Sequence, residues 1–472
     1  MNNMPLLSAL KQFVNKKTIS LHVPGHKNGT HSFINELNLP DLLKYDVTEL
    51  SGLDDLHYPT EAIKDSEELL SLLYGSDESF FLVNGSTVGN LASILALCGS
   101  NETVLVQRNC HKSIFHGLSI AGSKPVFLPL DIDKKLGQPL GINLSESIKI
   151  IKENPNAKAI ILTNPNYYGM SQDLTELINI AHQLNVPVIV DEAHGAHFII
   201  GEPFPKSSLE MGADIVIQSA HKTLPAMTMG SYLHVKSNIV EAYQMKEMLR
   251  MLQSSSPSYP IMASLDYARW FLEQFSKEKV VKLQRNIQLF IDQLDNLPTI
   301  EVVTSSNLSY KQDLLKVIVK SKLGHSGSYL QGLLEKESVY TELSDWAHVL
   351  LILPLDPNEN FKEHIERISR ATSNLLDVTN ELPTISMPNF NSIVMESYAG
   401  LKSKRKIVRN LSDALGEISA ENIVPYPPGV PILLKGELIT EEHIRYILEL
   451  KSRDITIQNL LIHDQIQIEI FQ

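Results

Sequence analysis

The sequence predicts an α/β protein with a mainly parallel central sheet, and three observations support this class. Short apolar runs bounded by turn residues recur from residue 80 onward, and segments with helical spacing of apolar residues separate them. Strands that alternate with helices in this way form parallel sheets covered on both faces. Clusters of polar residues directly follow the runs, at the end where such sheets bind ligands. A smaller α+β region is expected after this large domain.

The first part of the chain supplies the predicted sheet and its helices. We expect strands at Phe80–Val83, Thr103–Gln107, Pro125–Leu130, Ala159–Thr163, Pro187–Val190, Ala213–Ile217 and Tyr232–Val235. We expect helices at Ser8–Asn15, Glu61–Tyr74, Leu174–Leu184, Ile239–Met251 and Met262–Leu294. Two more helices are expected, one that follows the turn Asn84–Asn90 and runs through Leu97, and one that begins with Arg108–Ser113.

The second part of the chain predicts the smaller α+β region. Strands are expected at Glu301–Thr304, Leu314–Val319 and Val349–Leu353, with helices at about 325–337 and 361–380. Asn380–Ser392 is rich in Pro and Asn and predicts a linker. The segment Val424–Pro431 is too dense in proline for a helix or a strand, and we expect a strand at Ile432–Leu434 and a helix at Glu441–Leu450 after it.

These elements predict four parts of the chain. Residues 1–60 form an N-terminal arm, residues 61–270 the large domain, residues 271–380 the first part of a C-terminal region, and residues 381–472 a C-terminal α+β domain. Within the arm, His22–Gly29 combines two histidines and a lysine with turn residues. This pattern fits a functional loop as well as an ordinary surface turn.

Composition excludes several classes of function. The chain has 472 residues, of which 43% are hydrophobic and 20% charged, and 41 basic against 54 acidic residues give a net charge of −13. This balance argues against nucleic-acid binding. No apolar run is long enough to cross a bilayer and the start lacks a signal peptide, so we expect a cytoplasmic protein. Cys98 and Cys110 form neither a disulfide framework nor a metal-binding motif, and we expect no metal.

A lysine and an acid after two of the predicted strands indicate the chemistry of the site. Lys222 follows the strand at Ala213–Ile217, and Asp191 follows the strand at Pro187–Val190. A lysine in such a place is either a solvated surface residue or an amine that attacks an aldehyde. Paired with an acid after an earlier strand, it matches the needs of pyridoxal phosphate, whose aldehyde bonds to lysine and whose pyridine nitrogen is kept protonated by a carboxylate.

Two further segments fit the same cofactor but have simpler interpretations. The turn Asn84–Asn90 links a strand to a helix and can bind a phosphate through backbone N–H groups, although its hydroxyl residues can also simply cap the helix. His111 follows the strand at Thr103–Gln107. Its ring can stack on a planar cofactor or cap the next helix.

With these residues established, the chain resembles bacterial Orn/Lys/Arg decarboxylases, which have the aspartate-aminotransferase fold, also called fold type I. The resemblance covers nearly the whole chain in the order of the family. It rests on His22–Gly29, Asp46–His57, Asn84–Asn90, Arg108–Ser113, Asp191–Gly195, Ser219–Thr223, Ser254–Tyr259 and Pro425–Glu437.

The resemblance implies a role for each of these site residues. Lys222 would bond to pyridoxal phosphate, Asp191 would bind its pyridine nitrogen, and His111 would stack on its ring. The remaining cofactor-binding residues would be Ser86, Thr87, His194, Ser219 and His221, with Ser254 reaching the cofactor of a neighbouring subunit. Glu437 would face the distal group of a basic substrate.

Three features depart from the pattern of the larger enzymes in the family. No flavodoxin-like wing domain precedes His22, so we expect a homodimer with shared active sites rather than a decamer. Lys435-Gly436-Glu437 replaces the usual Pro-Gly-Glu, and His57–Glu61 lacks a glycine that is common there. The last two features affect the expected substrate preference rather than the chemistry.

The resemblance implies decarboxylation of a basic amino acid, arginine or lysine before ornithine, to a polyamine-type amine. Lys222 or His111 would return the proton to the Cα carbon. Two alternatives stay open: another reaction on the same cofactor, such as transamination or a lyase reaction, and a non-catalytic regulator with this fold. A nicotinamide dehydrogenase is excluded because no GxGxxG turn follows a first strand.

Overall fold

A computed structural model describes residues 3–16, 24, 27–28, 40–133, 135–378, 396–425, 430–453, 455–462 and 465–472. The chain folds into two compact units. The first comprises Met1–Leu97, Pro187–Ile200 and Lys206–Phe275, and the second comprises Cys98–Val186, Gly201–Pro205 and Ser276–Gln472. The predicted linker Asn380–Ser392 and most of the turn His22–Gly29 lie outside the described residues.

Four buried strands form the sheet of the first unit. β1 (Glu78–Leu82), β10 (Ser231–Val235), β9 (Ile215–Gln218) and β8 (Val188–Asp191) lie in this order. β8 and β9 are parallel, whereas β10 is antiparallel to both β9 and β1. Consequently β1, β8 and β9 run in one direction and end at one edge of this sheet.

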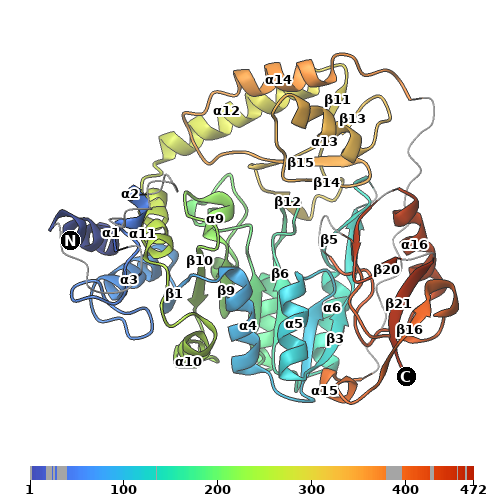
Figure 1. Ribbon diagram of the computed structural model, residues 1–472, viewed down its shortest axis with the longest axis horizontal. Coiled ribbons are helices and arrows are strands. Elements are labelled where there is room, and N and C mark those ends of the chain that lie inside the picture. Colours follow the sequence, from blue (N-terminus) through green and yellow to red (C-terminus); the bar gives the residue numbers. More distant parts are fainter. Residues whose placement is uncertain are drawn as a thin grey trace. The chain divides into compact units, whose positions relative to one another are not determined.

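The helices of the first unit pack against its sheet and against one another. α4 packs against β1, β8, β9 and β10 on one side and against α10 on another (Figure 1). α1 packs against α3 and α11. The helices are α1 (Pro5–Asn15), α2 (Pro40–Leu43), α3 (Ala62–Tyr74), α4 (Gly85–Leu97), α8 (Ser208–Met211), α9 (Ala220–Thr223), α10 (Ala242–Leu252) and α11 (Tyr259–Glu273).

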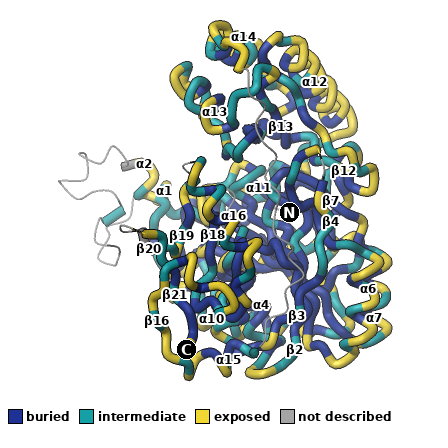
Figure 2. The backbone as a smooth tube through the Cα atoms, turned by 90° about the vertical axis from the view of Figure 1, so that its right-hand side faces the viewer, coloured by how far each residue is buried: buried dark blue, intermediate teal, exposed yellow. Residues whose placement is uncertain are grey.

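The second unit contains a parallel group of three strands. β2 (Thr103–Gln107) pairs in parallel with β3 (Lys124–Leu128) and with β6 (Ile160–Thr163). Figure 2 shows β2 and β3 as largely buried, whereas α6 and α7 carry exposed residues. The helices of this part are α5 (Lys112–Ala121), α6 (Leu144–Glu153) and α7 (Thr175–Gln183). Two short antiparallel pairs accompany them: β4 (Leu130–Asp133) with β5 (Gln138–Ile142), and β7 (Met170–Gln172) with β12 (Tyr310–Gln312).

An antiparallel sheet with three helices follows in the second unit. α12 and α14 pack against each other, and α13 packs against the sheet (Figure 1). The strands lie in the order β11 (Ile300–Val303), β13 (Lys316–Ser321), β15 (His348–Ile352) and β14 (Leu343–Ser344). The helices are α12 (Lys277–Asp295), α13 (Gly327–Lys336) and α14 (Lys362–Thr372).

The last part of the chain has a core of its own, formed mainly by aliphatic side chains of β19, β21, α16 and the segments between the elements. β21 pairs with three strands, and β18 pairs with β19. The elements are α15 (Tyr398–Leu401), β16 (Lys406–Asn410), β17 (Ile418–Ser419), β18 (Val424–Pro425), α16 (Glu441–Ser452), β19 (Ile457–Gln458), β20 (Leu461–Ile462) and β21 (Ile466–Phe471).

The structure confirms the predicted fold class, an α/β protein with a mainly parallel sheet and a smaller α+β part. Three predicted elements are wrong in detail. The helix at Met262–Leu294 is two helices, because Ser276 caps a new one by accepting a hydrogen bond from the Lys279 N–H. The helix expected at about 361–380 ends at Thr372.

The third difference concerns the expected strand at Ile432–Leu434. Only Leu433 forms an isolated bridge there, to Ile423, while Val424–Pro425 of the proline-dense segment forms the short strand β18. The Ile432 N–H and the Leu433 carbonyl bond to the backbone of Ile423, and side chains supply the bonds on either side of this bridge. Arg108 donates to the Ile432 carbonyl, and Glu437 accepts from the Leu434 N–H.

Candidate active site

Three polar segments leave the sheet of the first unit at one edge. Asp191 lies opposite Ile217 in the parallel pair of β8 and β9, so the residues after both strands emerge together. β1 runs in the same direction and leads into the turn before α4. This edge therefore presents Asp191, the last residue of β8, together with Ser86 and Lys222, which lie shortly after the ends of β1 and β9.

Lys222 lies in α9, the single helical turn that follows β9. Its Nζ is 3.0 Å from Nε2 of His194, which is buried. At this distance an imidazole nitrogen can form a hydrogen bond with the amine. The lysine, which would act as a nucleophile, is therefore positioned by His194.

Asp191 is a buried carboxylate held by two hydrogen bonds. It is 3% exposed, its Oδ2 accepts from Asn90 Nδ2 at 2.9 Å, and its Oδ1 accepts from the Ala193 N–H at 3.1 Å. These two hydrogen bonds fix the orientation of the carboxylate at the end of β8. Sequence reasoning missed Asn90 as a site residue, although it lies four positions after Ser86 and thus on the same face of α4.

The turn before α4 brings hydroxyl groups and a helix N-terminus together. Gly85 has a φ of +73°, which glycine adopts without strain, and its N–H donates to the Met229 carbonyl. Ser86 and Ser219 lie with their hydroxyl oxygens 2.7 Å apart, and Thr87 is exposed at the same helix end. Hydroxyl donors at the start of a 13-residue helix form a suitable site for a phosphate.

His221 is fixed by the backbone of the strand that follows it. Its Nδ1 lies 3.0 Å from the Gly230 carbonyl, and burial lowers the pKa of its ring. The neutral ring donates through Nδ1, so its Nε2 can donate to a phosphate only after protonation. A phosphate dianion would favour that protonation.

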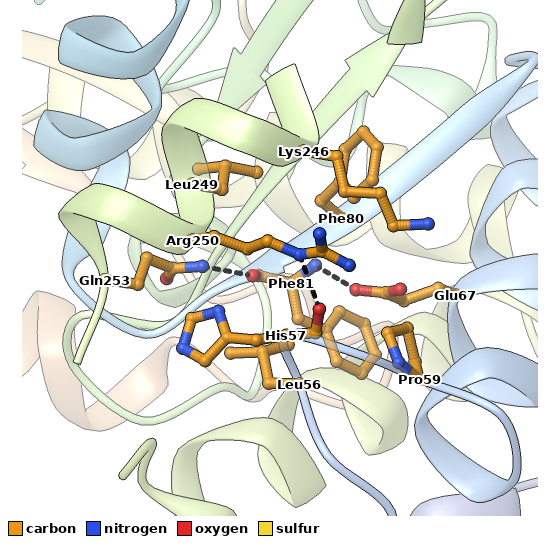
Figure 3. A pocket seen from close by; sticks show the side chains of 10 residues that line it. All are labelled: Leu56, His57, Pro59, Glu67, Phe80, Phe81, Lys246, Leu249, Arg250 and Gln253. Atoms are coloured by element: carbon orange, nitrogen blue, oxygen red, sulfur yellow. Dashed lines mark hydrogen bonds between the residues drawn. The ribbon is translucent and has the colours of Figure 1, made fainter. Parts of the chain in front are cut away.

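Ser254 lies on an exposed turn after α10. Its hydroxyl donates to the Ser256 carbonyl and accepts from the Ser256 N–H, while its carbonyl accepts from His57 Nε2 at 2.7 Å. Arg250 Nε in turn donates to the His57 carbonyl. Figure 3 shows His57 and Arg250 beside a small pocket, which is lined by Leu56, His57, Pro59, Glu67, Phe80, Phe81, Lys246, Leu249, Arg250 and Gln253. The expected contact of Ser254 with a neighbouring subunit stays a prediction.

His111 belongs to the second unit, where it is the N-cap of α5. Its Nδ1 accepts from the Ser113 N–H and lies 2.8 Å from the Ser113 hydroxyl. The helix-capping interpretation of this residue therefore holds. Because the cap occupies only Nδ1 and the ring edge, it leaves stacking on a cofactor as a compatible prediction.

Glu437 also belongs to the second unit and is fully buried. Its Oε2 lies 2.7 Å from Arg108 Nη2 and accepts from the Leu434 N–H at 2.6 Å. Sequence reasoning missed Arg108, although it begins the segment Arg108–Ser113. The expected contact of Glu437 with the distal group of a substrate stays a prediction.

Several other features of the described residues bear on function. The described part of the chain contains no cluster of His, Cys, Asp or Glu residues suited to a metal ion. Within the same residues, none of the helices is both long and apolar enough to cross a membrane. Cys98 and Cys110 are buried and are not joined in a disulfide, and Cys110 Sγ accepts from the Thr163 hydroxyl.

Comparisons with known proteins relate this chain to one family of sequences. The sequence model "Orn/Lys/Arg decarboxylase, major domain" matches residues 4–316, and that of the C-terminal domain matches residues 381–456. The protein YaaO of Bacillus subtilis, itself uncharacterized, is 46% identical, with 97% of this chain and 96% of YaaO covered. The arginine decarboxylase of B. subtilis is 32% identical, with 96% and 95% covered.

Solved structures show the same fold. The lysine decarboxylase LdcF of Francisella novicida superposes with a TM-score of 0.83 at 22% identity, and the match covers 99% of this chain and 81% of LdcF. An L-threonine transaldolase of Pseudomonas fluorescens superposes with a TM-score of 0.55 at 18% identity, covering 67% of this chain and 73% of the transaldolase.

Proposed function

This chain belongs to the Orn/Lys/Arg decarboxylase family, and we propose from this membership that it decarboxylates arginine or lysine in preference to ornithine, releasing a polyamine-type amine. The family assigns the class of enzyme, a decarboxylase that depends on pyridoxal phosphate. The identity of the substrate rests on the curated relative at 32% identity, which is named an arginine decarboxylase.

The residues of the first unit fit pyridoxal phosphate. The cofactor needs an amine for its aldehyde, a carboxylate for its pyridine nitrogen and donors for its phosphate. Lys222, Asp191 and the pair of hydroxyls on Ser86 and Ser219 provide these groups from three strand ends at one edge of one sheet. This convergence is the single structural observation that carries the proposal that the chain uses pyridoxal phosphate.

When bound, pyridoxal phosphate supplies an electron sink for the electron pair that the departing carboxyl group leaves behind. The protein residues prepare and direct this chemistry. Asp191, which accepts hydrogen bonds from Asn90 and the Ala193 N–H, would bind the protonated pyridine nitrogen of the cofactor. His194 Nε2, 3.0 Å from Lys222 Nζ, orients the amine of the lysine. Lys222 or His111 then returns a proton to Cα.

We also propose roles for the remaining site residues and an assembly for the active protein. Thr87, at the exposed start of α4, and the ring of His221 complete the phosphate site. Ser254 lies on an exposed turn and contacts the cofactor of a second subunit, so the active form is a homodimer with shared sites. The proposed compartment is the cytoplasm, where the two buried thiols stay reduced. Measurement of the solution mass by light scattering tests the dimer.

The proposed activity is tested by measuring CO2 release with arginine, lysine and ornithine under identical conditions. We expect release from arginine or lysine to exceed release from ornithine. Lys222→Ala should abolish release and also remove the visible absorbance that the cofactor gains on bonding to a lysine. If the wild-type protein loaded with cofactor releases CO2 from none of the three amino acids, the proposed substrate class is wrong.

A further inference from the structure

The side chains of Arg108 and Glu437 form an ion pair that is buried on both sides. Arg108 is 1% exposed and Glu437 0% exposed, and Nη2 lies 2.7 Å from Oε2. Arg108 also donates to two backbone carbonyls, that of Pro431 from Nη1 at 2.9 Å and that of Ile432 from Nη2 at 3.3 Å. The carboxylate accepts from the Leu434 N–H at 2.6 Å. Each side chain of the pair therefore contacts an opposite charge and at least one backbone group.

These bonds join two segments that are far apart in the chain. Arg108 directly follows β2, whereas Glu437 lies 329 residues later, in the segment after β18. Backbone hydrogen bonds to Ile423 and Ser419 hold that segment within its own part of the chain. Arg108 adds the bonds that tie the segment to the exit of β2, and Glu437 holds Arg108 in position to make them.

The environment makes the two charges depend on each other. Burial lowers the pKa of Arg108 and raises the pKa of Glu437, and in each case the charge of the partner opposes that effect. The nearby His443 is neutral at pH 7, because burial and Arg108 lower its pKa to about 4. His443 therefore does not act as a second cation for Glu437. A carboxylate that turned toward a substrate would leave a buried guanidinium without its counter-charge.

The exit of β2 connects this pair to His111. Only Asn109 and Cys110 separate Arg108 from His111. The turn is short and internally bonded: Asn109 accepts from Gln107 Nε2, and the Cys110 N–H donates to the Gln107 carbonyl. A displacement of Arg108 is therefore transmitted to the start of α5, which the His111 ring caps.

We propose that Glu437 is a positioning residue, which acts through Arg108 to hold the exit of β2 and thereby the ring of His111, and that it does not bind the distal group of the substrate. The ion pair itself stands on the structure alone. The inference rests on the proposed function only for the role of His111.

The test compares Glu437→Gln with the wild-type holoenzyme. A positioning residue changes kcat and stability, whereas a residue that binds the substrate cation changes KM. We expect kcat for arginine and lysine to fall at least about tenfold, KM to change less than about threefold, and the melting temperature to fall by about 5 °C or more. Glu396→Gln, which removes a partly exposed ion pair with Lys404, is the control and should leave all three values near those of the wild type.

A second variant keeps the test decisive if Glu437→Gln does not fold. Arg108→Met/Glu437→Leu replaces the pair with apolar side chains of similar volume, and we expect it to melt above Glu437→Gln, since no buried charge is left alone. Its KM for the basic substrate should also stay within about tenfold of the wild type.

Two results overturn the inference. One is an increase in KM of tenfold or more in Glu437→Gln, whatever its stability, and the other is a Glu437→Gln protein that melts like the wild type. If the wild-type protein shows no decarboxylase activity, the proposed function fails separately. The melting temperatures of the single and double variants then still decide whether the buried pair holds the two segments together.

Discussion

Replacement of Gly89 by alanine tests how α4 is held against the sheet that carries the proposed cofactor site. A Cβ at Gly89 would lie 2.8 Å from Leu82 Cδ1 and 2.9 Å from Ile217 Cγ2. Both neighbours are fully buried, and Ile217 Cγ2 is a branch close to the backbone of β9 that moves little. The helix must therefore move away from the strands, and its N-terminus, with Ser86, moves with it.

The expected change in the free energy of unfolding is the sum of two opposing contributions. Overpacking of a buried contact costs about 1–3 kcal/mol, whereas glycine to alanine within a helix gains about 1 kcal/mol. Gly332 in α13 isolates the first contribution, because an added Cβ there meets nothing within 4 Å. We expect Gly89→Ala to be less stable than Gly332→Ala by about 1–3 kcal/mol.

The assay is urea denaturation of both variants and the wild type, followed by far-UV circular dichroism, with cofactor affinity measured in parallel by fluorescence. Gly332→Ala should be at least as stable as the wild type and bind the cofactor equally well. Gly89→Ala should be less stable and bind the cofactor more weakly. Equal stability of the two variants would refute the close packing of α4 that we infer.

Three further predictions concern charged groups of the first unit. Asn90→Ala should lower kcat roughly 10–100-fold while the cofactor still bonds to the lysine, because a hydrogen bond to a charged group contributes about 1.5–3 kcal/mol; an unchanged kcat would contradict a role for Asn90. Asp191→Asn should lower kcat further than Asn90→Ala, since it removes the anion itself, and steady-state kinetics of both variants with arginine and lysine would show the order. Burial raises the pKa of Glu67 from 4.5 to about 8. Between these two pH values the folded protein keeps a proton that the unfolded chain releases. The free energy of unfolding should therefore fall as the pH rises from 4.5 to 8, by up to about 1.4 kcal/mol per pH unit. Glu67→Gln, which can still accept the Phe81 N–H, should flatten this decline in urea titrations at pH 5, 6.5 and 8, and identical slopes would exclude Glu67 as its source.

The elements that the sequence predicts well are those whose signal is local. The strand at Thr103–Gln107 is an apolar run between polar neighbours, and the structure has it with the same bounds. The break between α11 and α12 was missed because apolar spacing continues across it, and only a serine cap marks it. The segment at Ile432–Leu434 is apolar like a strand, but it pairs only with Ile423, and its other hydrogen bonds include those to Arg108 and Glu437, which no local pattern reveals.

The residues of the candidate site also differ in whether a local sequence pattern reveals them. Lys222 and Asp191 could be identified because each follows its own apolar run, and the parallel pairing of β8 and β9 then brings these strand ends to one edge. Asn90 was missed because its role depends on a contact with Asp191, 101 residues later in the chain. The same reasoning applies to Glu437, whose acidic side chain suggests a contact with a basic substrate until its buried partner is known. A charge read from the sequence indicates what a residue can attract, but only the fold decides whether Arg108 or a substrate is the group that it meets.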